Sequence, residues 1–185
     1  MKNKNIFKWI LSGIFFVLIG LVPVFADRDG DDDDEYEYNR RNSQRSSSAY
    51  VENKLYKQEC SSCHYLYNPE LLTEASWEAV LQGQSQHFGE NLGLDASAIS
   101  EILTHLKNNS AEKSRSEWGR KITRSSGSKA YLRITEVPWI IKEHRKISDE
   151  TFKRPSIKSR SNCTACHKNA ASGDFEEDSV SIPRN

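Results

Sequence analysis

The stretches Cys60-Ser61-Ser62-Cys63-His64 and Cys163-Thr164-Ala165-Cys166-His167 are two copies of one pattern, and they contain all four cysteines of the chain. The spacing Cys-x-x-Cys-His is typical of c-type haem attachment, because the two thiols can each add to a vinyl group along one porphyrin edge. The histidine that follows then reaches the iron as its proximal ligand. The sequence therefore predicts two covalently bound haems c, attached through Cys60, Cys63, Cys163 and Cys166, with His64 and His167 on the irons.

Other uses of paired cysteines explain this pattern less completely. A zinc site needs both pairs to converge on one ion, and it gives the two following histidines no role. A thioredoxin-like pair belongs in a strand–helix–strand context that the sequence does not show. Disulfides closed within each Cys-x-x-Cys loop would brace almost nothing. The haem interpretation is therefore preferred over these three alternatives.

The N-terminal residues indicate export. Residues 1–8 carry three lysines and no acid, an apolar run follows from Trp9 to Phe25, and small residues end at Ala26. A basic head, a short apolar stretch and such a boundary describe a secretory signal peptide. We predict cleavage after residue 26 and a periplasmic location. An uncleaved membrane anchor is the alternative, because a run of about 17 residues is at the lower limit of a span.

Export changes the composition in two ways. The whole chain balances 26 basic against 26 acidic residues, so general binding to nucleic acid or to a membrane surface is not expected. Removal of residues 1–26 takes away three lysines and no acid, which leaves a net charge of 26 − 3 − 26 = −3. It also takes away Met1, the only methionine. The mature chain therefore has no methionine to offer as an iron ligand.

Histidine is then the economical source of the remaining iron ligands, which leaves His87, His105 and His144 as candidates. His87 continues an apolar helical pattern, and His144 follows an apolar run and precedes two basic residues that could pair with haem propionates. His105 lies about 100° from the centre of its helix stripe, which favours a surface position. We predict bis-histidine ligation by His87 at the first haem and His144 at the second. Crossed pairing, and ligation by His105, stay open.

The chain divides at changes of composition. Residues 27–48 hold an acidic run followed by serines and arginines, with no aliphatic residue, and are expected to form a disordered linker. Residues 49–185 are expected to form one dihaem domain, with a first haem half at 49–110, a polar connection at 111–130 and a second haem half at 131–185. We predict a mainly α fold, a small multi-helix cytochrome c-like architecture wrapped around two covalent haems, with much irregular chain.

Apolar periodicity places the helices of both halves. In the first half, Ser76 is expected to cap a helix whose apolar face continues to His87 and Phe88. Asp95 is expected to cap a second helix that fades at residues 108–109. In the second half, residues 131–135 predict a short strand or an extended segment, and Pro138 begins a short helix that reaches His144.

From Cys60 to Pro183 the chain resembles the small periplasmic dihaem cytochrome c family. The matching stretches, besides the two motifs, include Ser76-Trp77, His87-Phe88-Gly89-Glu90-Asn91, Arg133-Ile134-Thr135, Pro138-Trp139, His144, Gly173-Asp174-Phe175 and Ile182-Pro183. The resemblance implies a mostly helical electron carrier with two low-potential haems, whose second ligands correspond to His87 and His144. It also implies redox partner proteins, among them an oxygen-binding high-spin cytochrome or a membrane-bound cytochrome.

Three classes of function are compatible with two haems. Iron with two strong nitrogen ligands has no open position for substrate, which favours electron transfer without enzymatic activity, and hence no catalytic residue and no small-molecule substrate. A small haem enzyme, such as a peroxidase or a nitrogen-oxide reductase, needs a vacant or displaceable ligand. A gas or redox sensor needs one histidine that leaves the iron. Electron transfer is the function that the sequence favours.

Overall fold

A computed structural model describes residues 52–184 of the chain. The predicted signal peptide (1–26) and linker (27–48) lie outside the described residues. Within residues 52–184 the chain forms helices and irregular segments and no strand, so the mainly α prediction is confirmed. No helix in this range has the length and apolar character to cross a membrane.

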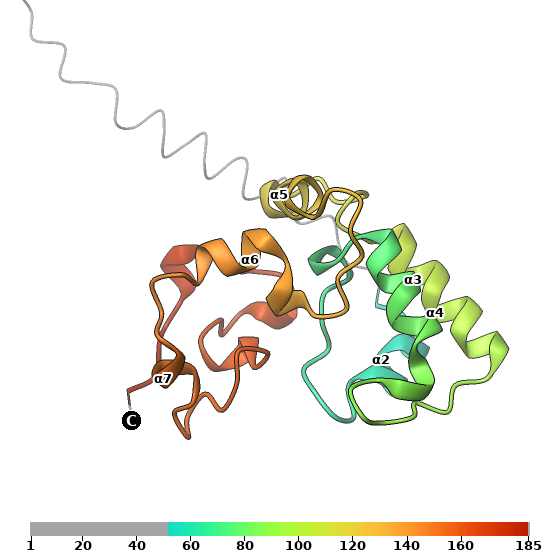
Figure 1. Cartoon of the computed structure of the whole chain (residues 1–185), viewed down its shortest axis with the longest axis horizontal. Coiled ribbons are helices and arrows are strands. Elements are labelled where there is room, and N and C mark those ends of the chain that lie inside the picture. Colours follow the sequence, from blue (N-terminus) through green and yellow to red (C-terminus); the bar gives the residue numbers. More distant parts are fainter. Residues whose placement is uncertain (1–51, 185) are drawn as a thin grey trace, which may run out of the picture. The chain divides into compact units, whose positions relative to one another are not determined.

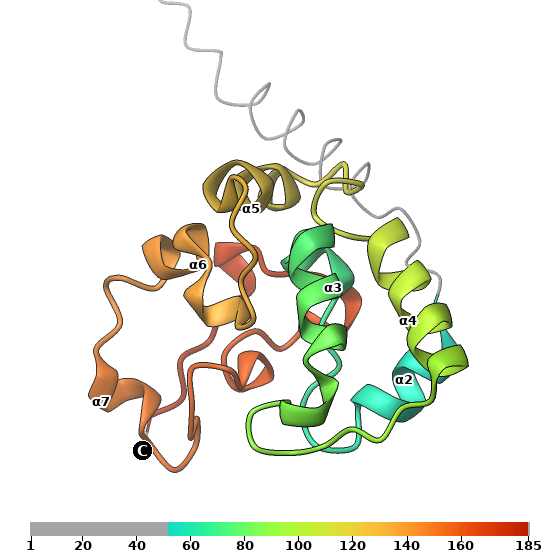
Figure 2. The same ribbon diagram turned by 45° about the vertical axis from the view of Figure 1, so that its right-hand side comes forward.

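Three α-helices and two short 3-10 helices make up the first half (Figure 1). They are α2 (Lys54–Cys60), η1 (Pro69–Leu71), α3 (Glu74–Gln82), η2 (Gln84–Gln86) and α4 (Ala96–Asn108). Helix α4 packs against both α2 and α3, and Figure 2 shows the three side by side in a second view. Helix α2 ends at the first attachment cysteine, so packing on α4 fixes the start of the first motif.

Helix capping confirms one prediction and corrects another. The Asp95 carboxylate accepts a 2.8 Å hydrogen bond from the Ala98 N–H and caps α4, as expected. Helix α3 begins three residues earlier than expected, because Thr73 and not Ser76 is its N-cap. Ser76 is instead fully buried, and its hydroxyl accepts a 2.9 Å hydrogen bond from the Tyr131 N–H. This residue joins the two halves of the chain.

The connection between the halves is a helix. The polar residues around 111–130 gave no periodic signal, yet α5 (Glu117–Ser126) forms there with a Ser116 cap. Its Trp118 and Ile122 are buried while its charged residues face outward, so a short apolar stripe was hidden among many polar residues. Gly119 permits the tight cap, because an added Cβ would lie 2.7 Å from the Ser114 Cβ.

The second half consists of short elements separated by turns (Figure 1). They are η3 (Ile134–Glu136), α6 (Pro138–Glu143), α7 (Asp149–Phe152), η4 (Cys163–Ala165), η5 (Ala170–Ser172) and η6 (Glu177–Ser179). No strand forms at residues 131–135, where the chain is irregular before η3. Helix α6 ends with His144 as its C-cap, as predicted.

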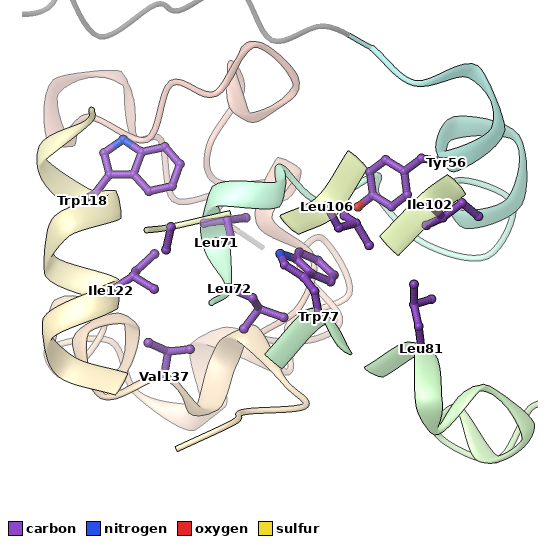
Figure 3. Close-up of a cluster of buried hydrophobic side chains, with 11 residues drawn as sticks. Tyr56, Leu71, Leu72, Trp77, Leu81, Ile102, Leu106, Trp118, Ile122 and Val137 are labelled. Carbon is purple, nitrogen blue, oxygen red and sulfur yellow. The ribbon is translucent and has the colours of Figure 1, made fainter. Parts of the chain in front are cut away.

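One apolar core serves both halves (Figure 3). Its buried members come from α2, η1, α3, α4, α5 and three residues outside helices (Leu72, Ala111 and Val137): Tyr56, Leu71, Leu72, Trp77, Leu81, Ile102, Leu106, Ala111, Trp118, Ile122 and Val137. The indole N–H of Trp77 donates a 2.7 Å hydrogen bond to the Pro69 carbonyl, so this buried polar group is satisfied. The motif residues lie outside this cluster, except that Cys60 packs against its edge.

Candidate functional site

The first histidine pair brings His64 together with His87. Their ring centroids are 6.3 Å apart and their planes are inclined by 36°. His87 does not lie on α3, as its spacing predicted, because that helix ends at Gln82. It begins a tight turn in which its N–H and C=O both bond to Glu90, at 2.7 and 3.1 Å. Phe88, with φ 56°, occupies the left-handed region inside this turn, so the backbone accepts strain to hold the imidazole.

The second histidine pair brings His144 together with His167. Their ring centroids are 6.0 Å apart and their planes are inclined by 65°. His144 lies at the C-terminal end of α6, and His167 directly follows the turn that contains Cys163 and Cys166. The structure therefore pairs the histidines by proximity along the chain and not in the crossed arrangement.

The spacing within each pair fits an iron bound between the two rings. A metal–imidazole bond is about 2.0 Å long and the ring centroid lies about 1.1 Å behind the nitrogen, so two imidazoles on opposite sides of one metal have centroids about 6.2 Å apart. The observed separations are 6.3 and 6.0 Å. Aromatic rings that pack against each other have centroids about 4.5–7 Å apart. The spacing therefore favours a metal ion only together with the Cys-x-x-Cys-His motif beside each pair.

In two of the four imidazoles, a hydrogen bond shows which ring nitrogen has a lone pair available for a metal. Nδ1 of His64 lies 2.7 Å from the Tyr65 carbonyl oxygen, and Nδ1 of His144 lies 2.8 Å from the Ile140 carbonyl oxygen. A carbonyl only accepts, so each Nδ1 carries the proton and each Nε2 keeps its lone pair. This is the orientation that an outer-shell carbonyl gives to a metal-binding histidine.

His167 is held by aromatic residues instead. Its Nδ1 is buried without a hydrogen-bond partner among the described residues. Phe175 packs against its ring at 5.3 Å and packs edge-on against Trp118 of α5 at the same distance. Burial lowers the pKa of His167 and favours the neutral ring that a metal requires. Helix α5, which the sequence did not predict, thereby supports the second pair.

The four cysteines are free of disulfides, and each pair directly precedes one member of a histidine pair. Burial raises the pKa of the Cys60 and Cys163 thiols to about 11, so neither is poised to be a thiolate. Within residues 52–184 no group of three or more His, Cys, Asp or Glu could hold a metal ion. Haem fits this donor set better than zinc, because the porphyrin supplies the other iron ligands.

His87 and His144 each have a phenylalanine neighbour whose ring is covered by an arginine. The sequence patterns did not predict this arrangement. At the first pair Phe88 lies 4.7 Å from the His87 ring, and the Arg133 guanidinium carbon lies 3.9 Å above Phe88. At the second pair the Phe152 ring lies 6.2 Å from the His144 ring, and Arg160 lies 4.1 Å above Phe152. The repetition of this stack places one guanidinium near each histidine pair, and a carboxylate partly offsets each charge, Glu136 at 3.7 Å from Arg133 and Asp149 at 2.5 Å from Arg160.

Two tyrosines after the first motif reach the second. The Tyr65 hydroxyl donates a 2.6 Å hydrogen bond to the Ala170 carbonyl, and the Tyr67 hydroxyl donates a 3.0 Å bond to the Ser161 carbonyl. Burial is the main cause that raises the Tyr67 pKa, which keeps this hydroxyl a donor at neutral pH. Nothing in the sequence around these tyrosines indicates such partners, which lie 105 and 94 residues away.

His105 lies in a different environment. It is half-buried on α4, its ring centroid is 5.6 Å from that of Tyr56, and its backbone carbonyl accepts a 2.8 Å bond from the Asn109 amide. A shallow groove beside it is lined by Asn53, Ser97, Ser100, Glu101 and Thr104. This groove contains no member of either histidine pair, and the paired rings are the better candidate site, because they combine iron-ligand spacing with the attachment cysteines.

Comparisons with known proteins agree with this geometry. Residues 56–175 match the family described as dihaem cytochrome c. A solved structure of a diheme cytochrome c from Rhodobacter sphaeroides is 35% identical, with a TM-score of 0.59, over 68% of this chain and 98% of that chain. A diheme cytochrome type c from Shewanella baltica OS155 is 31% identical, with a TM-score of 0.57, over 71% of this chain and 93% of that chain. No curated protein matches.

Proposed function

This chain belongs to the dihaem cytochrome c family and binds two haems c through its Cys-x-x-Cys-His motifs, and on that premise we propose that it is a periplasmic electron carrier with two low-potential, bis-histidine haems. The haems supply one-electron chemistry. The polypeptide attaches them, closes both sides of each iron and separates them from substrates. Its function is then to pass electrons between partner proteins.

The observation that carries this proposal is the spacing of the two histidine pairs. The separations of 6.3 and 6.0 Å match two imidazoles on opposite faces of one metal. His64 and His87 are the proposed ligands of the first iron, and His144 and His167 those of the second. Nitrogen ligands on both faces favour lower potentials than a methionine ligand does. They also leave no position for a substrate, so electron transfer is favoured over peroxidase, reductase or gas-sensor activity.

Positioning explains how the chain holds these ligands ready. Each pair joins a histidine next to an attachment cysteine to a histidine fixed at a turn or a helix end. The carbonyl bonds to His64 and His144 fix the ring tautomer before the metal is bound. Because both histidines of each pair already lie in place, the chain would need to rearrange little when a bound haem is reduced. A small rearrangement on reduction is what an electron carrier needs.

Spectroscopy of the exported, haem-loaded protein tests the ligation directly. Near-infrared magnetic circular dichroism of the oxidised protein reports the axial ligand pair, and we expect bis-histidine bands from both haems. Carbon monoxide added to the reduced protein should leave the low-spin spectrum unchanged. A rapid and complete spectral shift with carbon monoxide would instead support an enzyme or a sensor.

The surroundings of the second pair favour a negatively charged redox partner. Residues 142–160 contain seven basic and three acidic side chains, a net charge of +4. Arg160 lines a small cleft with His144 and Phe152, so positive charge lies close to the second histidine pair. We propose docking of an acidic redox protein there, steered by charge. Electron transfer to such a partner should slow as ionic strength rises.

The proposed periplasmic location is supported by the N-terminal sequence and by haem chemistry. Residues 1–26 have the composition of a secretory signal peptide, and attachment of c-type haem takes place outside the cytoplasm. Cell fractionation, with N-terminal sequencing of the mature protein, tests this location. Recovery of the haem protein in the cytoplasm would contradict it.

A further inference from the structure

A continuous series of contacts runs from the first histidine pair to the second attachment site. The Tyr67 ring packs against the His64 ring, with centroids 4.9 Å apart and planes inclined by 34°. The Tyr67 hydroxyl donates a 3.0 Å hydrogen bond to the Ser161 carbonyl. The same carbonyl lies 3.7 Å from the Cys163 sulfur. One side chain therefore touches both a proposed ligand of the first iron and the segment that carries the second haem.

Tyr65 makes a parallel contact that differs in one respect. Its hydroxyl donates a 2.6 Å hydrogen bond to the Ala170 carbonyl, so it too connects the halves of the chain. Its ring packs edge-on against Tyr67 at 5.4 Å. The Ala170 N–H in turn donates a 3.1 Å hydrogen bond to the His167 carbonyl. Tyr65 thus forms a second and longer route, which crosses two hydrogen bonds and the Ala170 backbone and ends on the backbone of His167 instead of at an attachment cysteine.

We propose that Tyr67 is the positioning residue that couples the two haem sites and sets the rate at which they exchange electrons, an inference that rests on the electron-carrier function proposed above. In this exchange one electron leaves the reduced iron and enters the oxidised iron. No bond forms or breaks, and Tyr67 remains a protonated phenol. Electronic coupling falls with every bond and contact that is crossed. The route His64–Tyr67–Ser161–Cys163 crosses one hydroxyl hydrogen bond and ends at a sulfur that would be bonded to the second haem, so it is favoured over the longer route through Tyr65, Ala170 and His167.

The contact also fixes the geometry between the sites. The ring of Tyr67 is half-buried between the two segments, and its hydroxyl is anchored at the far side. Positioning of reacting groups to within about 0.5 Å depends on such supporting contacts. Loss of the hydroxyl would free the Ser161 segment from the ring on His64, and the electron would then cross an unbonded gap.

Two matched variants test the inference in the haem-loaded protein. Tyr67→Phe keeps the ring against His64 and removes only the hydroxyl, while Tyr65→Phe removes the comparable hydroxyl of the longer route. Pulse radiolysis measures the concentration-independent phase of electron exchange, and proton NMR line widths of the half-reduced protein give the same rate at equilibrium. Urea midpoints report the structural cost, which should be similar because each variant loses one hydrogen bond.

We expect several-fold slower internal exchange in Tyr67→Phe and a rate close to that of the unaltered protein in Tyr65→Phe. Tyr67→Leu, which also removes the ring, should be slower still. An unchanged rate in Tyr67→Phe would overturn the proposal, and so would equal slowing in both phenylalanine variants, because Tyr67 would then have no special role in the exchange. The low-spin spectrum of each protein checks bis-histidine ligation separately, so failure of that proposal is distinguishable.

Discussion

Replacement of Arg133 by glutamine should lower the reduction potential of the first haem. Arg133 lies over Phe88, which lies against His87, so its positive charge is the one that the stack holds near this site. A positive charge stabilises the form of the site that carries one more electron. Its removal therefore favours the oxidised form. Glu136, 3.7 Å from the Arg133 guanidinium, would lose its partner, which acts in the same direction.

The structure bounds the size of this shift. The guanidinium carbon lies 3.9 Å from the Phe88 ring centroid, and that centroid lies 4.7 Å from the His87 ring centroid. An iron bound by His87 would lie about 3 Å from the His87 centroid. The charge would therefore lie within about 12 Å of the iron. At about 12 Å a unit charge contributes about 1.4 kcal/mol at an effective dielectric constant of about 20 and about 0.35 kcal/mol in water. For one electron this range is about 15–60 mV. Because the Arg133 side chain is 53% exposed, we expect the lower part of the range.

Spectropotentiometric titration measures this shift, with two variants as controls. Arg133→Lys keeps the charge and should keep the potential within the scatter of the measurement. Arg160→Gln removes the corresponding charge over Phe152 and should lower the potential of the other haem. If neither potential moves in Arg133→Gln, or if both move equally, then the charge does not act through its place beside His87. The local electrostatic argument would then be refuted.

Three further predictions concern ligation, packing and pH. His87→Ala should produce one high-spin haem that binds carbon monoxide while the other stays low-spin; two unaltered low-spin haems would exclude His87 as a ligand. Ile122→Ala, at a fully buried position of α5, should lower the free energy of unfolding by about 2–5 kcal/mol in urea titrations, whereas Leu132→Ala at an exposed position should change it by less than about 0.5 kcal/mol. Burial is the main cause that raises the pKa of Glu70, so its contribution to stability is present at low pH and is lost as pH rises through the folded-state pKa. The stability of Glu70→Gln relative to the unaltered protein should therefore increase between about pH 4 and about pH 7. A pH-independent difference in stability would contradict this sign.

The helices show where periodicity alone is sufficient. Asp95 and the apolar stripe after it identified α4, because an exposed helix with one buried face repeats every 3.6 residues. Helix α5 was missed because Trp118 and Ile122 are its only buried apolar side chains and stand among charged neighbours. His87 was placed on a helix because its spacing continued the pattern of α3. The backbone instead leaves the helix at Gly83, the C-cap, and closes a turn of its own.

The sequence by itself determined the chemistry of attachment: two thiols and an iron ligand within five consecutive residues, at Cys60–His64 and Cys163–His167. This information is local, because both thioethers and the first iron bond need only one turn of chain. Only the tertiary structure decided which histidine faces which motif and how Tyr67 reaches Ser161. Those contacts join segments far apart in the sequence, and the burial of a shared apolar core sets them, which no short pattern encodes.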